Sequence, residues 1–141
     1  SITEDSCVML YIQGGELHLN FEIDSLNKAL TLFDRVLSGN CSNDIKNYCL
    51  YNKAQTLGKL NRNKEALILL NESNYPESDS SFLSYINQEK YYIHRYRNQN
   101  KKALKDINRA LSLNPKDDEF HYRKADVLYD LEKYNDALIE I

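Results

Sequence analysis

The hydrophobic residues of this chain recur at the three- and four-residue spacing of an amphipathic helix. The clearest run contains Leu50, Ala54, Leu57 and Leu60, and a polar turn follows at residues 61–63. This spacing places the apolar side chains on one face of a helix, and the polar turn ends that helix. The pattern predicts a helix that buries one side against its neighbours.

The same pattern returns along the chain at a nearly constant interval. Ala29, Ala66, Ala103 and Ala137 each open an apolar helical run, and their spacings are 37, 37 and 34 residues. A period in the mid-thirties with a small residue in each unit is typical of stacked helix pairs. We expect four units in one domain, the last of them incomplete: residues 5–40, 43–76, 80–114 and 117–141.

Small residues mark the points where helices are expected to approach each other closely. Ala54, Ala125 and Ala137 lie at such points, and Gly14 and Gly15 fill the equivalent place in the first unit. A larger side chain at a close approach costs about 1–3 kcal/mol through overpacking. We therefore expect these residues to lie between helices and to have no role in ligand binding.

Proline and acidic residues place one helix boundary. Pro115 cannot continue a helix and restricts Asn114 before it, so a helix should end near residue 114. Residues 117–119 are all acidic, and the dipole at the start of a helix favours acids there. A new helix is expected to begin at about residue 118.

The third unit fits the period least well. Alignment from Ala103 alone would place four polar residues in the core: Asn87, Lys90, His94 and Arg97. Charged and polar side chains are seldom buried. A turn that is longer by one residue instead turns three apolar side chains inward, and we expect this register: Ile86, Ile93 and Tyr96.

Four short segments carry a resemblance to a known family. Residues 51–54 and 122–125 are similar to the first helix of a tetratricopeptide repeat (TPR), residues 110–115 to the end of its second helix, and residues 133–137 to the turn between them. The tryptophan usual in the family is absent, and Leu50 and His121 stand in its place. The resemblance implies an all-α fold, a right-handed solenoid of about 3.5–4 antiparallel helix pairs.

Charge is unevenly distributed along the chain. The formal net charge is −3, but residues 90–109 contain seven basic residues and the single acid Asp106, which gives this segment a charge of +6. Such asymmetry bears on partners and not on the fold. The basic residues are Lys90, Arg95, Arg97, Lys101, Lys102, Lys105 and Arg109.

Cysteine usage and the amino terminus suggest a compartment. Cys7, Cys41 and Cys49 make an odd number without a CxxC pair, so we interpret them as buried reduced thiols. The first five residues do not resemble a signal peptide, and no stretch approaches the length of an apolar membrane span. These features predict a cytoplasmic protein, which we expect to be part of a longer chain.

The sequence contains no recognisable catalytic or metal-binding motif. His18, His94 and His121 lie in separate units, without the HExxH pattern or an i, i+4 partner that a zinc site would use. Nucleotide-binding glycine loops and a GxSxG nucleophile motif are also missing. We therefore predict a protein that is not an enzyme and needs no cofactor.

The TPR resemblance implies that the first helices of the units line a concave groove that holds a protein or peptide partner. Tyrosine and arginine in such a groove suit binding hot spots. An equally open interpretation is that half of the tyrosines pack between helices. The candidate partner-binding residues are Tyr48, Tyr51, Asn52, Gln55, Lys59, Tyr91, His94, Arg95, Tyr122, Arg123 and Asp126, with Tyr129 beside them.

Other functions remain open. Some TPR co-chaperones clamp the acidic carboxyl terminus of Hsp70 or Hsp90. Asn52 falls on one clamp position, whereas Ile12 and Glu16 do not match and Arg123 lies one unit too late. Residues 90–109 combine basic and aromatic residues, as RNA-binding segments do. Two further possibilities are a purely structural stretch of a solenoid and self-association through Leu138 and Ile141, which have no following helix to cover them.

Overall fold

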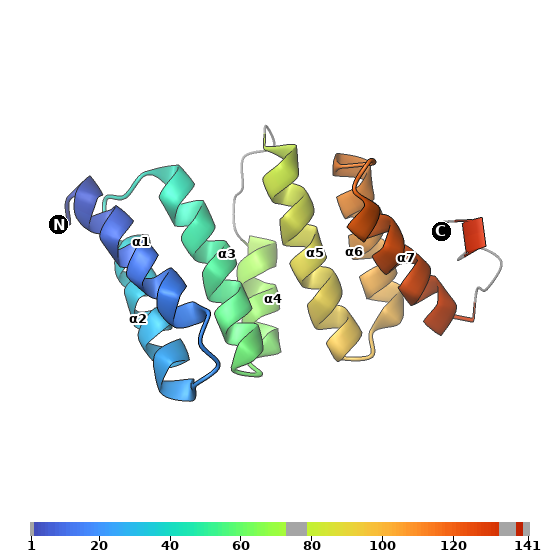
Figure 1. The fold of residues 1–141 in the computed structure, drawn as a ribbon, viewed down its shortest axis with the longest axis horizontal. Helices are drawn as coiled ribbons and strands as arrows, with labels where there is room; N and C mark the ends of the chain where they lie inside the picture. The colour runs from blue at the N-terminus through green and yellow to red at the C-terminus, as the bar shows by residue number, and fades with distance from the viewer. Residues whose placement is uncertain (1, 73–78, 133–137, 140–141) are drawn as a thin grey trace. The chain divides into compact units, whose positions relative to one another are not determined.

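Seven α-helices and no strands make up the residues that the computed structural model describes, 2–72, 79–132 and 138–139 (Figure 1). They fall into two compact units, Ser1–Ser73 and Asn74–Ile141. The all-α prediction is confirmed. Unit 1 holds α1 (Glu4–His18), α2 (Ile23–Ser38), α3 (Asn43–Lys59) and α4 (Asn63–Glu72), and unit 2 holds α5 (Ser80–Tyr96), α6 (Asn100–Leu113) and α7 (Asp118–Asp130).

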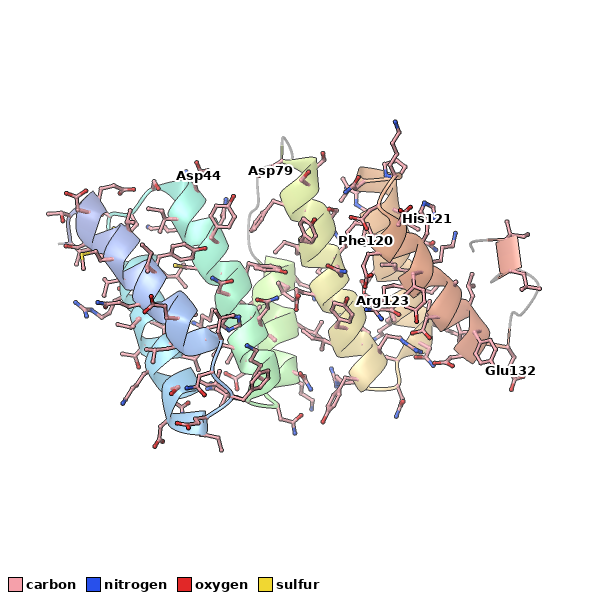
Figure 2. All side chains as sticks on the ribbon, viewed as in Figure 1. Asp44, Asp79, Phe120, His121, Arg123 and Glu132 are labelled. Carbon is pink, nitrogen blue, oxygen red and sulfur yellow. A yellow bond between two sulfur atoms is a disulfide. The ribbon has the colours of Figure 1, made fainter. Side chains whose placement is uncertain are left out.

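Side-chain caps start four of the helices. Thr3, Ser42, Asp79 and Asp117 precede α1, α3, α5 and α7, and each accepts a hydrogen bond from the backbone N–H three residues later. Figure 2 shows Asp79 at the start of α5. Such a cap satisfies an N–H group that would otherwise lack a partner. The helix start at residue 118 is therefore as predicted, and α6 ends at Leu113, just before Asn114 and the proline.

The same left-handed backbone conformation recurs just after α3, α5 and α7. Asn61, Asn98 and Glu132 follow these helices and have φ angles of 61°, 56° and 62°. A single left-handed residue is a common way to end a helix. These three residues are separated by 37 and 34 residues, which are the spacings of the alanines from Ala66 onward. Helix α1 ends differently, because Asn20 at the equivalent position does not have a positive φ angle.

The core of unit 1 lies where α1 packs against both α2 and α3. Phe33 is fully buried there, and Gly14 lies directly against its ring. A Cβ atom on Gly14 would come within 2.6 Å of Phe33 Cε1, so the close approach predicted for this glycine is confirmed. The same prediction is wrong for Gly15, because a Cβ atom there would meet nothing within 4 Å.

In unit 2, α6 packs between α5 and α7, and the core register is largely as predicted. Ile86 and Ile93 are buried on α5. Tyr96 is not, since 71% of it is exposed, and its inward placement was wrong. It is the last residue of α5, so its ring projects beyond the packed part of the helix. Other buried residues form a cluster in this core: Tyr91, Ala103, Ile107, Ala110, Phe120 and Val127.

A disulfide between Cys7 and Cys41 corrects the interpretation of the cysteines. It joins α1 to the loop before α3 across a sequence separation of 34 residues. Next to Cys41, the Ser42 backbone N–H donates to Glu4 Oε2 at 3.2 Å, so a hydrogen bond also joins α1 to this loop. Stacked repeats bring residues that are one period apart in the sequence close together in space. A search for CxxC pairs does not detect a disulfide between such residues. Only Cys49 is a buried free thiol, as expected.

Candidate partner-binding surfaces

In unit 1, α1 and α3 present one joint surface, which we call the α1–α3 face. The rings of Tyr11 and Tyr48 lie 6.3 Å apart between their centroids, and this contact joins the two helices. Helical spacing places the other members of the face beside these rings. The face consists of Val8, Ile12 and Gly15 on α1 and of Tyr48, Tyr51, Asn52 and Gln55 on α3.

The α1 half of this face is apolar and exposed. Val8, Ile12 and the neighbouring Met9 are 40%, 51% and 60% exposed, and Tyr48 on α3 is 48% exposed. An apolar patch rimmed by polar groups is a common mark of a protein interaction site. Sequence reasoning did not include Val8 or Met9. The available signal was that α1 carries apolar residues on both of its sides, whereas a simple surface helix does so on one.

The α3 half supplies polar groups at defined positions. Gln55 Nε2 donates to the Tyr51 hydroxyl at 3.1 Å, which orients both side chains. The Asn52 side-chain amide makes no hydrogen bond within the described residues, so its donor and acceptor can both reach a partner. Tyr48, Tyr51, Asn52 and Gln55, predicted together, are also together in the structure.

Lys59 lies at the end of this face and not in its middle. Its Nζ donates to the backbone oxygen of His18 at 2.5 Å and lies 4.9 Å from the centroid of the Phe21 ring. The ammonium group thus meets the carbonyl end of α1, where the helix dipole favours a positive charge. Lys59 contributes to the packing of α1 on α3, in addition to any contact with a partner.

A buried hydrogen-bond chain connects α1 to α3 beneath this face. Thr56 Oγ1 donates to Asn52 O at 2.7 Å, and the Thr56 oxygen lies 2.8 Å from His18 Nδ1. Because the hydroxyl proton goes to Asn52, Nδ1 of His18 must be the donor in the second bond. Burial, followed by the positive charge of Lys59, lowers the pKa of His18 to about 4.

This depressed pKa predicts acid sensitivity. The unfolded chain binds a proton on His18 near pH 6.5, and the folded chain binds it only near pH 4, so stability falls as the pH drops between these values. We expect wild type to lose about 2 kcal/mol of unfolding free energy between pH 7 and pH 4.5 through this group. Urea denaturation should show that loss to be absent in His18→Asn. Equal pH dependence in both proteins would contradict the prediction.

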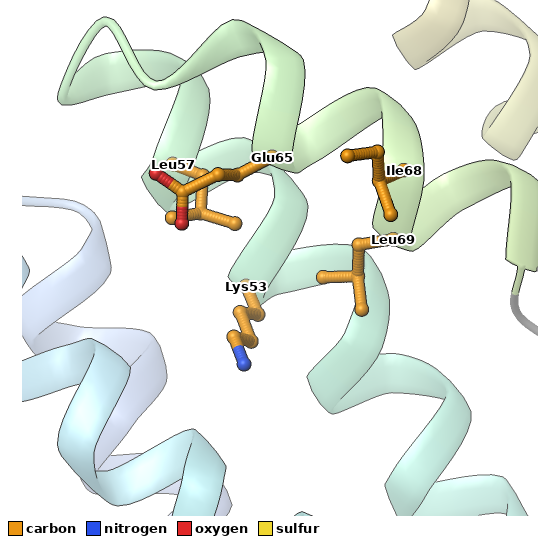
Figure 3. Close-up of a pocket in the computed structure, with 5 residues that line it drawn as sticks. All are labelled: Lys53, Leu57, Glu65, Ile68 and Leu69. Atoms are coloured by element: carbon orange, nitrogen blue, oxygen red, sulfur yellow. The ribbon is translucent and has the colours of Figure 1, made fainter.

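A shallow pocket of about 250 Å³ lies between α3 and α4 (Figure 3). Lys53 and Leu57 line it from α3, and Glu65, Ile68 and Leu69 line it from α4. The Lys53 ammonium group is paired with Asp34 at 2.6 Å. Small-molecule sites usually span about 300–1,000 Å³. The pocket therefore has room for a single side chain of a partner and little more.

In unit 2, Tyr91 is a core residue. It is 1% exposed, and its hydroxyl donates to Arg123 O at 3.0 Å across the gap between α5 and α7. Burial raises the pKa of Tyr91 to about 12, so the phenol stays neutral. Its predicted place on a binding surface does not hold in this structure. Where a helical turn has apolar residues on several sides, the sequence does not indicate which of them is buried.

His94 also points away from the predicted groove. Its Nδ1 lies 2.5 Å from Asp106 Oδ2 on α6, and the two side chains are only 12% and 13% exposed. Burial raises the pKa of Asp106, and the hydrogen bond from His94 opposes that rise. The pair ties α5 to α6 and leaves neither group available to a partner.

Arg95 faces α7, but its charge is already matched. Its guanidinium contacts Asp126 at 3.1 Å and Asp130 at 2.5 Å, and it donates to Asn100 Oδ1 at 3.0 Å. Arg95 and Asp126, predicted as separate partner contacts, therefore bind each other. The positive charge of Arg95 is therefore neutralised by two acids of α7.

Arg123, labelled on α7 in Figure 2, lies close to the rings of two tyrosines. Its Cζ is 5.4 Å from the Tyr92 ring and 5.3 Å from the Tyr122 ring, and Glu119 accepts from its Nε at 2.7 Å. Tyr122 remains exposed. This small platform is the part of the predicted site in unit 2 that a partner can reach.

The residues that the structure describes contain neither a cluster of metal ligands nor a helix that could span a membrane. Among residues 2–72, 79–132 and 138–139, no three His, Cys, Asp or Glu side chains come together as metal ligands. Over the same ranges, no helix has the length and apolar character needed to cross a membrane.

Part of the fourth unit falls outside the described residues. The predictions for Tyr134, Ala137 and Ile141, including the turn at residues 133–137, concern that part of the chain. Leu138 and Ile139 are described and are largely exposed. Self-association through this end stays a prediction.

Comparison with known proteins gives structural matches. No family model matches the chain, and a comparison with curated proteins finds no match. A structure of MamA, residues 41 to the end, from Desulfovibrio magneticus RS-1 superposes with a TM-score of 0.70 and 19% identity, over 93% of this chain and 69% of that one. The ArsTM double mutant of MamA RS-1 gives a TM-score of 0.71 at 19% identity, over 93% and 68% of the two chains.

These matches and the helix pairs define the class of the fold. At 19% identity the likeness concerns the fold alone, and that fold is an all-α, TPR-like helical solenoid. The predicted fold class is confirmed. Membership of the TPR family itself stays a prediction from residues 51–54, 110–115 and 122–125.

Proposed function

We propose that this chain is a protein-interaction scaffold without enzymatic activity, which binds a peptide segment of a partner on the α1–α3 face. One observation carries the proposal. Exposed apolar side chains of α1 lie beside the tyrosines of α3 and beside Asn52, whose side-chain amide is available for hydrogen bonding. A site of this kind buries apolar side chains of the peptide and bonds its backbone through the amide.

The contrast with unit 2 supports this choice. There the candidate residues Tyr91, His94 and Arg95 are occupied by bonds within the unit. A partner would have to break these bonds before gaining any of its own, and a buried bond that is broken costs more than one exposed to water. The chaperone-clamp and RNA-binding alternatives, and the four unit boundaries given above, stay predictions.

The test begins with selection of peptides. A displayed library of random peptides is selected on the folded chain, and the dissociation constant of the best peptide is measured by fluorescence anisotropy. We expect Ile12→Asp and Tyr48→Ala each to weaken binding by about tenfold or more, because each removes an apolar contact at the centre of the face.

Tyr122→Ala is the matched control, since it removes another exposed tyrosine, from unit 2. It should leave the dissociation constant within about twofold. If instead Tyr122→Ala abolishes binding and the unit 1 variants do not, the partner binds the tyrosine platform on α7. If no variant matters, the α1–α3 face is not the binding site.

The disulfide bears on the compartment. Disulfides persist in oxidising environments and are rare in the reducing cytoplasm. The bond between Cys7 and Cys41 therefore favours an oxidising compartment over the cytoplasm that the cysteine pattern suggested. Alkylation of intact cells followed by mass spectrometry distinguishes the two, since a cytoplasmic protein would carry alkyl groups on both residues.

A further inference from the structure

The exposed side of α6 carries positive charge only. Lys101, Lys102, Lys105 and Arg109 are all exposed, and the positions i, i+1, i+4 and i+8 place them on one side of the helix. From the first to the last, the helix rises about 12 Å. We call these four residues the α6 basic face.

One acid on the same helix offsets this face only in part. The only acidic residue of α6 is Asp106, which is mostly buried and held by His94, and of the four basic residues it attracts Lys105. None of the four basic side chains makes a hydrogen bond or ion pair with any described residue. In unit 1, the exposed Arg62 and the half-buried Lys53 each have an acidic partner, Glu65 and Asp34.

The four positive charges of the α6 basic face destabilise α6. Lys101 and Lys105, and Lys105 and Arg109, are like charges at i, i+4, which repel each other. Lys101 and Lys102 also lie in the first turn, where the helix dipole disfavours positive charge and where α1, α2, α3 and α7 each have an acid. The attraction between Lys105 and Asp106 compensates for only part of this repulsion, and a local rule broken in this way is typical of a functional surface.

We propose that the α6 basic face docks an acidic helical segment of a partner protein. Glutamate or aspartate at every fourth position of a helix would follow the spacing of Lys101, Lys105 and Arg109. Occupation would remove the repulsion within α6, so charge complementarity both attracts the partner and fixes its register. This site is on a different helix and in a different unit from the α1–α3 face, and it stands whether or not that face binds a peptide.

Nucleic acid fits the same face less well. The helix has no aromatic residue on which a base could stack. Two aromatic residues of α5 that gave residues 90–109 their RNA-binding character are engaged elsewhere, Tyr91 in the core and Tyr92 under Arg123, whereas Tyr96 at the end of the helix is exposed. The chain as a whole is also negative, which repels phosphate.

The experiment uses the whole chain and two fluorescein-labelled probes. One is a helical peptide with glutamate at every fourth position, and the other is a single-stranded RNA of mixed sequence. We expect the acidic peptide to bind, with an affinity that falls as the salt concentration rises. Lys101→Glu/Lys105→Glu/Arg109→Glu should weaken that binding roughly tenfold or more.

Lys28→Glu/Arg35→Glu/Lys64→Glu is the control, because it makes the same change in net charge at exposed positions of unit 1. It should leave binding within about twofold. Since glutamate substitutions could unfold α6, the triple glutamine variant is measured as well, and circular dichroism checks all three. Equal losses in the α6 and control variants, no binding of the acidic peptide, or tighter binding of the RNA would each overturn the proposal.

Discussion

Reduction of the Cys7–Cys41 disulfide is expected to lower the free energy of unfolding of unit 1 by about 4 kcal/mol. The bond closes a loop across 34 residues, and opening it restores the conformational freedom of that loop in the unfolded chain. Denaturation with and without a reducing agent measures the difference. Hydrogen exchange should report the change on α1, the helix that the bond attaches to the loop before α3.

Cys7→Ala/Cys41→Ala supplies the control for this experiment. Its stability should match that of the reduced wild type and should not respond to the reducing agent. Burial raises the pKa of the Cys49 thiol to about 12, so little thiolate is present to attack the disulfide and exchange with it. Equal stability of oxidised and reduced wild type would show that the bond constrains nothing.

Removal of the His94 side chain should cost a similar amount in unit 2. The Asp106 side chain is 13% exposed in the wild type, and His94→Ala removes its hydrogen-bond donor; breaking a buried pair of this kind costs about 4 kcal/mol. Thermal or chemical denaturation of the variant gives the value. The loss comes from the group that remains behind, more than from the contact that is deleted.

A double variant separates these two contributions. In His94→Ala/Asp106→Leu the carboxyl group that lost its donor is itself gone, so this protein should be more stable than His94→Ala alone. His121→Ala is the matched control on α7, where the histidine lies at the surface and bonds Pro115 O, and it should cost less than about 1 kcal/mol. Additive losses from the two substitutions would mean that the residues do not interact.

The helices and most of their boundaries could be predicted because they depend on local chemistry. Alternation of apolar and polar residues at the helical period, the proline at residue 115 and the acids after it all act within a few residues of the chain. The caps at Ser42 and Asp117 belong to the same class of signal. None of these features requires knowledge of what a helix packs against.

The candidate site was predictable only in part. On α3, Tyr48, Tyr51, Asn52 and Gln55 share a helix face by spacing alone, so they stay together in the structure. On α5 the same reasoning failed for Tyr91, which the core of unit 2 encloses. Spacing tells which residues share a face, but burial of that face depends on where the next helix passes.

Two pairings between residues that are distant in the chain could not be predicted from spacing either. Arg95 meets Asp126 from 31 residues away, and Cys7 meets Cys41 from 34 residues away. Both separations are close to one repeat, so the period brings these residues near each other. The period does not determine which side chains then pair, since that depends on the rotation of each helix about its own axis.

The sequence by itself determined that this chain forms helices, that they recur in pairs with a period in the mid-thirties, and that positive charge is concentrated in residues 90–109. The reason is that helix propensity, capping and periodicity are local. Only the tertiary structure decided that Arg95 forms ion pairs with two aspartates and that Cys7 and Cys41 form a disulfide. It also decided that apolar residues of α1 remain exposed beside Tyr48. Those outcomes depend on how whole helices pack, and the free energy of packing is shared among residues that are distant in the chain.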